Sequence, residues 1–344
     1  NLTARLREAL PWCEAGHEVA WEQWPLPLRA TESVQVTERP NQPEAVSSAL
    51  ELQDTAGQWI VRGQGFEITF DRQRAALSGY QFAGRQLLTQ PLEHCFMRAR
   101  TDNDYMIGNS GGYYQEWLEA GLDRLQTEVQ ECSSTQLDES RALVRCHTRH
   151  VAEGKIHGFD CESTYLMHAD GRVVVENTVR ADRALPVLPR VGMRAELEAS
   201  LEAVEWYGRG PHENYCDRKH SARVGVYRST VEEQFFPFVD PSECGGHEDV
   251  RRLQLSDRSG VALCITGRPA FHFSALHYTM EDLLQAGHVY ELQRTPGVQL
   301  HLDGFHMGLG GDTGWTRNVH PEYLLPPTVY RYAFDIQAVS QSTS

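Results

Sequence analysis

The stretch YLMHADGRVVVENTV, residues 165–179, contains two strand-like runs joined by Asp170 and Gly171. An Asp-Gly pair between two such runs predicts a tight β-hairpin. Comparable runs alternate apolar and polar residues or are rich in Val, Ile, Tyr and Phe, which is typical of strands. They recur at 58–62, 66–70, 142–150, 172–179, 260–266, 298–302 and 330–336. We therefore predict an all-β protein built as a large β-sandwich.

Two segments have short helical patterns. In 114–122, Trp117 and its apolar neighbours fall at helical offsets. In 279–286, Thr279 stands three residues before Asp282, which approximates a capping box with Asp in place of the usual Glu or Gln. We expect these helices to embellish the sandwich.

Composition excludes several classes of protein. The 344 residues have a net charge of −15 and no basic patch, which argues against nucleic-acid binding. Lys155 and Lys219 are the only lysines, so phosphate-loop and Schiff-base lysine chemistry is not expected. No apolar run approaches the roughly 20 residues of a membrane span. The eight scattered cysteines form no CxxC pair and predict free thiols in a reducing, cytoplasmic compartment.

The chain divides into three segments. Residues 1–28 hold two strand-like runs joined by a turn-like EAGH, whereas 29–55 are polar and rich in Pro, Ser, Thr and Glu. Two strands cannot bury a core alone, and residue 1 is not Met. We therefore expect 1–28 to end an upstream β domain of a longer polypeptide, 29–55 to be a linker or edge crossing, and 56–344 to form the sandwich.

The densest motif is LDGFHMGLGGDTGW, residues 302–315. Its glycines permit positive φ and close backbone approach, so the segment is predicted to be an irregular loop. His306 lies within it and Trp315 ends it. An exposed Trp at that position would suit stacking on a pyranose ring, and burial in the core is an equally good interpretation.

A second motif, WYGRGPHENYCDR at 206–218, places His212 and Glu213 beside a Gly-Pro turn. Such a pair can act as general acid and base. The favoured interpretation is structural: Gly-Pro sets the turn and the polar side chains bind its backbone.

A third motif, RARTDND at 98–104, has Asp102 and Asn103 next to Asp104, a group that could bind Ca²⁺. The ligand series of an EF-hand is missing, so turn capping is favoured. The Gly-rich residues that follow, 106–113, predict a mobile loop.

Two other residue types give weaker indications. Cys244 and His247 stand three residues apart in a Gly-rich segment, with no third group placed to orient a thiol nucleophile. The strand-associated histidines have no partner at metal-ligand spacing, so no metal site is predicted. These are His94, His147, His150, His157, His168, His272 and His301.

Taken in order, these motifs resemble one family. The chain resembles the C-terminal third of the large bacterial β-galactosidases of the lacZ type, in glycoside hydrolase family 2. The matching segments are EAGHEVAWEQWPL (14–26), RARTDND (98–104), WYGRGPHENYCDR (206–218), PSECGG (241–246) and LDGFHMGLGGDTGW (302–315).

The resemblance implies an architecture and a division of labour. Residues 1–28 would be the last strands of an immunoglobulin-like domain, and the remainder a small-chain sandwich similar to galactose mutarotase. The two catalytic glutamates, and the Mg²⁺ and Na⁺ of the family, would lie on a barrel upstream. This chain would then hold no catalytic residue, no metal and no cofactor, and would act on β-galactosides only within a larger, tetrameric enzyme.

The resemblance also implies site residues. Trp315 would reach into the active site of the barrel and stack on the sugar. Gly108, Asn109 and Ser110 would lie in a mobile loop over that site, although the loop is several residues shorter than in the family.

Two other functions remain open at this point. A stand-alone aldose epimerase would use His212, Glu213 and His306 as acid and base candidates. A carbohydrate-binding module would bind galactose without catalysis.

Overall fold

A computed structural model describes residues 1–26, 49–105, 111–312 and 317–340. The chain forms two compact units, Asn1–Val46 and Ser47–Ser344. In the first unit, β1 (Leu2–Arg5) and β2 (Glu18–Glu22) pair antiparallel. Among the described residues, no helix is long and apolar enough to cross a membrane.

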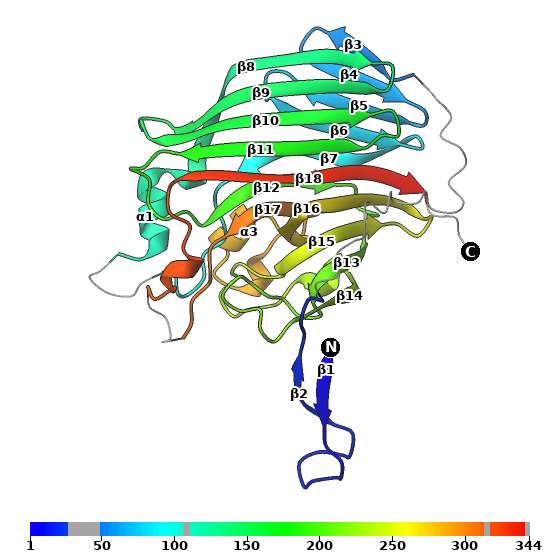
Figure 1. The fold of residues 1–344 in the computed structure, drawn as a ribbon. Coiled ribbons are helices and arrows are strands. Elements are labelled where there is room, and N and C mark those ends of the chain that lie inside the picture. The colour runs from blue at the N-terminus through cyan, green and yellow to red at the C-terminus, as the bar shows by residue number, and fades with distance from the viewer. Residues whose placement is uncertain (27–48, 106–110, 313–316, 341–344) are drawn as a thin grey trace. The chain divides into compact units, whose positions relative to one another are not determined.

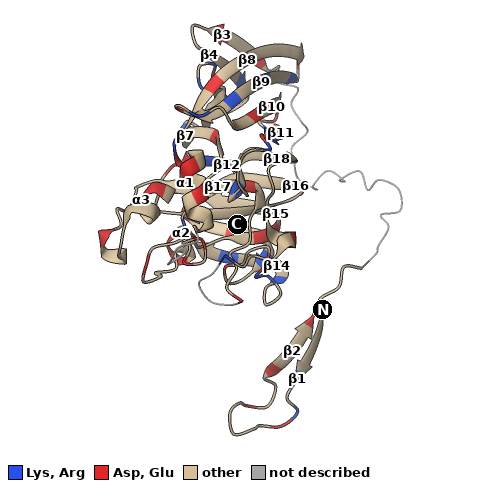
Figure 2. Cartoon of the chain, turned by 90° about the vertical axis from the view of Figure 1, so that its left-hand side faces the viewer, with Lys and Arg blue, Asp and Glu red and all other residues tan. Residues whose placement is uncertain are grey.

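In the described part of the second unit, sixteen strands form one antiparallel sheet that folds over on itself (Figure 1, and Figure 2 in a view turned by 90°). The strand order is β3-β4-β5-β6-β7-β12-β17-β16-β18-β11-β10-β9-β8, and β15 continues from β16 to β13 and β14. The strand bounds are β3 Glu51–Thr55, β4 Gln58–Gly63, β5 Phe66–Asp71, β6 Ala76–Phe82, β7 Arg85–Cys95, β8 Leu125–Asp138, β9 Arg141–Ala152, β10 Gly158–His168, β11 Val173–Ala181, β12 Arg190–Leu197, β13 Ala203–Gly210, β14 Arg223–Thr230, β15 His247–Ser256, β16 Val261–Leu276, β17 Val298–His306 and β18 Val329–Ser340.

Apolar side chains from the two halves of this sheet meet in a large core, and a second apolar cluster includes residues of α1 (Tyr113–Ala120) and α3 (Met280–Gln285). On β6, Tyr80 is buried and its hydroxyl donates to the carbonyl of Gly171, 2.6 Å away in the β10–β11 turn. The ring of Phe70 on β5 meets that of Tyr165 on β10 with centroids 5.0 Å apart. These contacts confirm the predicted all-β sandwich, because alternate residues of facing strands fill the space between the layers.

Local predictions were largely confirmed. The Asp170-Gly171 hairpin joins β10 to β11. The seven predicted strand segments coincide with strands, apart from Arg172 and Gly260, which each lie one residue before the strand begins. Helix α3 (Met280–Gln285) begins after Thr279, whose hydroxyl accepts from the N–H of Asp282 at 3.0 Å. Helix α1 (Tyr113–Ala120) ends two residues earlier than predicted, because Gly121 adopts φ +80° and caps it. The other helical segments are α2 Val231–Gln234 and the 3₁₀ turns Leu122–Arg124, Val289–Glu291 and Pro321–Tyr323.

Three details differ from the sequence expectations. Cys132 on β8 and Cys146 on β9 face each other in register and form a disulfide, so the prediction of free thiols throughout was wrong for this pair. β3 lies inside the predicted 29–55 segment; its mostly exposed residues give little apolar alternation. Leu302–His306 belongs to β17, so the irregular loop begins only at Met307.

Candidate functional site

The third motif, RARTDND at 98–104, builds a rigid connection between two loops. Arg98 is fully buried and donates to Asp104 Oδ1 at 2.7 Å. The same guanidinium donates to the carbonyl oxygen of Met307 at 2.7 Å, more than 200 residues along the chain. Asp104 Oδ2 accepts from the N–H of Thr101 at 2.9 Å. A buried charged pair that also bonds the backbone of both segments fixes their relative position.

Further bonds hold the start of the glycine-rich loop. Asn103 Nδ2 donates to the carbonyl of Leu309 at 2.8 Å, and the N–H of Gly310 donates to Asp217 Oδ2 at 2.7 Å. Gly310 has φ +71°, a conformation that favours glycine. A Cβ added at Gly308 would lie 2.5 Å from Asp217 Oδ2, so the loop needs glycine there too.

The far ends of the same two loops are also joined. Arg317, the first described residue after 313–316, donates to Glu116 Oε2 on α1 at 2.9 Å. Its guanidinium lies 4.4 Å from the ring centroid of Tyr113, the first residue of α1 after 106–112. We call these tied segments, 98–105, 111–117, 307–312 and Arg317, the loop platform.

Beneath the platform lies a buried network of charges. Arg190 pairs with Asp303 Oδ2 at 3.0 Å and with Glu243 Oε1 at 3.2 Å, and all three side chains are buried. His272 Nδ1 lies 3.1 Å from Asp303 Oδ2. His306 Nε2 lies 3.8 Å from Glu243 Oε1. We call these five residues the ionic network.

Burial sets the protonation of two members of this network. It lowers the pKa of His306 well below the ordinary value of a histidine. It raises the pKa of Glu243, against the opposite influence of Arg190. His306 is therefore neutral at neutral pH and closed off from solvent on most sides, which suits a packed structural histidine.

A cavity of about 270 Å³ opens beside the network. Its walls include His272, His306 and Glu248, and burial raises the pKa of Glu248. Neither His212 nor Glu213 belongs to the residues that line it. The described part of the chain therefore does not bring the three epimerase candidates into one pocket.

His212 and Glu213 instead support the turn, as the structural interpretation expects. His212 Nε2 lies 2.9 Å from the hydroxyl of Ser221 on the surface. Glu213 accepts from the N–H of Gly245 at 2.9 Å and from Arg218 at 2.6 Å.

The remaining candidates fall into two groups. Asn103 belongs to the platform, and Asp102 is exposed next to it. Trp315 and the loop residues Gly108, Asn109 and Ser110 lie outside the described residues. The interpretation of RARTDND considered Asp102, Asn103 and Asp104 and gave no role to Arg98. The buried role of Arg98 depends on Met307, which only the fold brings near.

The Cys244–His247 pair does not form a nucleophile. Burial raises the pKa of the Cys244 thiol to about 12, and burial lowers the pKa of His247 to about 3. His247 Nε2 bonds Gln234 Oε1 at 2.6 Å. A thiol protonated at neutral pH beside a histidine already engaged elsewhere lacks the activation that nucleophilic catalysis needs.

Comparison with known families decides the identity of this fold. Residues 62–336 match the family described as the β-galactosidase small chain, and residues 1–27 match domain 4 of β-galactosidase. The chain belongs to the β-galactosidase small-chain family. The resemblance drawn from the ordered motifs is thereby confirmed.

Curated relatives of this small chain are much longer. It is 35% identical to a β-galactosidase of Vibrio cholerae over 99% of its own length and 32% of the relative. It is 31% identical to a β-galactosidase of Priestia megaterium over 94% of its length and 30% of the relative. The chain thus spans about a third of the length of the curated relatives it matches.

Solved structures similar to the small chain include aldose epimerases. A galactose 1-epimerase from Lactobacillus acidophilus covers 86% of the chain with a TM-score of 0.45 and 7% identity. An Escherichia coli protein described as a putative aldose 1-epimerase covers 86% with a TM-score of 0.44 and 11% identity.

Proposed function

We propose that this chain is the non-catalytic C-terminal part of a β-galactosidase that hydrolyses terminal β-D-galactosides such as lactose. It completes the wall of an active site whose catalytic glutamates, Mg²⁺ and Na⁺ belong to a barrel in the preceding part of the enzyme. Trp315 stacks on the galactosyl ring, and the loop containing Gly108, Asn109 and Ser110 closes beside it. The assembled enzyme is a cytoplasmic homotetramer.

The observation that carries this proposal is the double tie between the two loops. Asn103 and Arg98 hold the start of the 307–315 segment, and Arg317 binds the helix that follows 106–112. Tied in this way, the loop assigned to closure and the loop assigned to stacking emerge from one rigid support. Binding and catalytic residues on loops depend on such a scaffold for their precision.

The state of the candidate acids and bases supports the non-catalytic role. Glu213 is bound to Gly245 and Arg218, Asp303 to Arg190 and His272, and His306 is buried and neutral. Retaining hydrolysis of a glycoside requires two carboxyl groups about 5–5.5 Å apart and facing the sugar. The candidates named here are committed to structural bonds instead.

The test is a chimera in which this chain replaces the matching last third of the Vibrio cholerae relative. The chain alone should hydrolyse o-nitrophenyl β-galactoside no faster than buffer, and the chimera should be active. Trp315→Ala should reduce kcat/KM of the chimera at least tenfold. Tyr290→Ala, at an aromatic side chain that is 80% exposed, is the matched control and should have no effect.

Three outcomes would overturn the proposal. Hydrolysis by the isolated chain would place catalytic residues on it. Acceleration of galactose anomerisation by the isolated chain, lost in His306→Ala, would favour an epimerase. Tight galactose binding by the isolated chain in calorimetry would favour a carbohydrate-binding module.

A further inference from the structure

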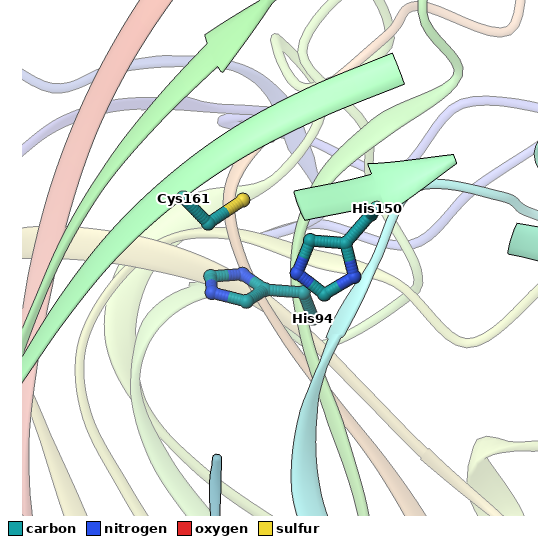
Figure 3. A group of neighbouring side chains, drawn as sticks. All are labelled: His94, His150 and Cys161. Carbon is teal, nitrogen blue, oxygen red and sulfur yellow. The ribbon is translucent and has the colours of Figure 1, made fainter. Parts of the chain in front are cut away.

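A separate group of side chains meets inside the sandwich and takes no part in the loop platform. His94 comes from β7, His150 from β9 and Cys161 from β10. One potential ligand atom of each lies within 4.8 Å of those of the other two. Figure 3 shows the two imidazole rings and the sulfur converging from the three strands. We call this group the thiol–imidazole cluster.

Strand register explains why the cluster forms. On β9, residues 142–152 alternate so that Thr148 and His150 face the core. On β10, Cys161 pairs with Thr148 and also faces inward. His94 projects from β7, where its ring stacks on Phe96 with centroids 5.8 Å apart. Three inward positions on three strands thus converge on one point of the interior.

Hydrogen bonds assign the proton of His94 to one ring nitrogen and leave the other nitrogen unprotonated. The Ser163 hydroxyl donates to Asn177 Oδ1 at 2.7 Å, so its oxygen is left to accept from His94 Nε2 at 3.0 Å. The Nε2 therefore carries the proton and Nδ1 carries a lone pair. That Nδ1 is buried and has no hydrogen-bond partner among the described residues. A histidine whose second nitrogen is oriented by an outer hydroxyl is the arrangement found in metal ligands.

The other two members are buried side chains whose donor atoms suit a metal ion, an imidazole on His150 and a thiol on Cys161. His150 exchanges hydrogen bonds with the hydroxyls of Thr127 and Thr148 at 3.1 and 2.9 Å. One of these hydroxyls can rotate away and release the lone pair of the imidazole. A cavity of about 10 Å³ is lined by His94 and His150 but not by Cys161, and it is far too small for a substrate.

The ligand set and the burial together select the ion. We propose that His94, His150 and Cys161 form a binding site for one Cu⁺ ion. Thiolate and imidazole are preferred by Cu⁺ and by Zn²⁺. Binding breaks the S–H bond of Cys161, forms an S–Cu bond and releases the proton to solvent. One thiolate with Cu⁺ leaves a neutral complex, whereas Zn²⁺ would bury a net positive charge and require a fourth ligand.

The ionic network is a poorer candidate for a metal site than the thiol–imidazole cluster. His272, Asp303 and His306 also lie within 4.8 Å of one another. Asp303, however, already pairs with the guanidinium of Arg190. A cation there would lie beside a buried positive charge, whereas the only formal charge that the thiol–imidazole cluster contributes is the thiolate created on binding.

The experiment uses the 344-residue chain, reduced and kept free of oxygen. Cu⁺ is added against a competing chelator, and the bound metal is counted after gel filtration. We expect one Cu⁺ per chain, and X-ray absorption should find one sulfur and two nitrogen neighbours at about 2.0–2.3 Å. Cys161→Ser and His94→Ala should each weaken binding at least tenfold, with folding verified by circular dichroism.

Two variants serve as controls. Cys244→Ser removes a buried cysteine outside the cluster and should bind Cu⁺ normally. The double variant Cys132→Ser with Cys146→Ser should also bind normally, because reduction of that disulfide creates a competing thiol pair. If X-ray absorption finds two sulfur neighbours per copper in the wild-type chain, the proposal is overturned whatever the variants show. Binding that survives Cys161→Ser, or retention of Zn²⁺ in place of Cu⁺, would overturn it as well.

Discussion

The ionic network and the thiol–imidazole cluster are both buried and both contain two histidines, yet they solve opposite problems. In the network, Arg190 supplies a permanent charge that Asp303 and Glu243 balance. In the cluster, His94, His150 and Cys161 are kept neutral by burial. The comparison teaches that the role of a buried histidine depends on which groups surround it. Beside the Arg190 guanidinium, His272 and His306 each lie next to a carboxylate. In the cluster, His94 and His150 are hydrogen-bonded to neutral hydroxyls instead.

Removing Arg190 should have the largest effect. Arg190→Met leaves Asp303 and Glu243 buried without their cation, and loss of one partner of a buried ion pair costs about 3–5 kcal/mol. Urea unfolding of the 344-residue chain measures this loss.

The matched control is Arg180→Met, because Arg180 pairs with Glu162 at 2.8 Å on the exposed side of β10 and β11. Exposed pairs contribute at most about 1 kcal/mol. Equal losses in the two variants would show that the network contributes no more than a surface ion pair.

Lowering the pH should reduce the stability of the chain through buried histidines that lack a carboxylate partner. His247 allows this effect to be measured at a single residue. Burial lowers the pKa of His247 to about 3. Between pH 6.5 and 3, this histidine is therefore protonated in the unfolded chain and neutral in the folded chain. Stability is therefore complete above pH 6.5 and falls as the pH drops, by up to about 1.4 kcal/mol per pH unit for this group.

Urea unfolding at pH 7 and pH 4 tests this effect. His247→Gln should reduce the difference between the two pH values, whereas His288→Gln, at a 59% exposed side chain, should leave it unchanged. An unaltered difference in His247→Gln would mean that His247 is protonated in the folded chain.

Ser163→Ala should have a smaller effect confined to the cluster. It leaves His94 Nε2 and Asn177 Oδ1 without their shared hydroxyl, and an unsatisfied buried group costs about 1–3 kcal/mol. Thermal unfolding at pH 7 provides the measurement. Because the variant frees the tautomer of His94, it should also weaken Cu⁺ binding. Full Cu⁺ affinity in this variant would show that the Ser163 hydroxyl has no role in the metal site.

Arg317→Ala should change stability least, by under about 1 kcal/mol, since Arg317 and Glu116 form a partly exposed pair. The same substitution should lower kcat/KM of the chimera more than it lowers stability, because it releases the end of the segment that contains Trp315. The measurement is kcat/KM set beside urea unfolding of the same preparation. A variant with normal kcat/KM would show that the tie has no role in catalysis.

Much of the fold could be predicted because its determinants are local. The Asp170-Gly171 turn, the Thr279–Asp282 cap and the alternating strands each depend on a few neighbouring residues. The turn, the cap and the named strand segments were identified, whereas β3, whose residues are mostly exposed, was missed. Errors occurred where pairing partners are distant. β17 continues to His306 because β12 pairs with it as far as that residue, although its sequence there is rich in loop-forming residues.

The sequence by itself determined the family, the strand pattern and the loops with their glycines, since these depend on residue order and on backbone freedom. Tertiary structure alone decided which polar residues would meet. Arg98 reaches Met307, and His94 reaches His150 and Cys161, because the fold brings distant segments of the chain together. Metal-ligand spacing along the chain could not reveal the cluster, because its members lie on three strands whose register only the folded sheet defines. The physical reason is that burial and charge pairing are properties of a place in the fold and not of a position in the sequence.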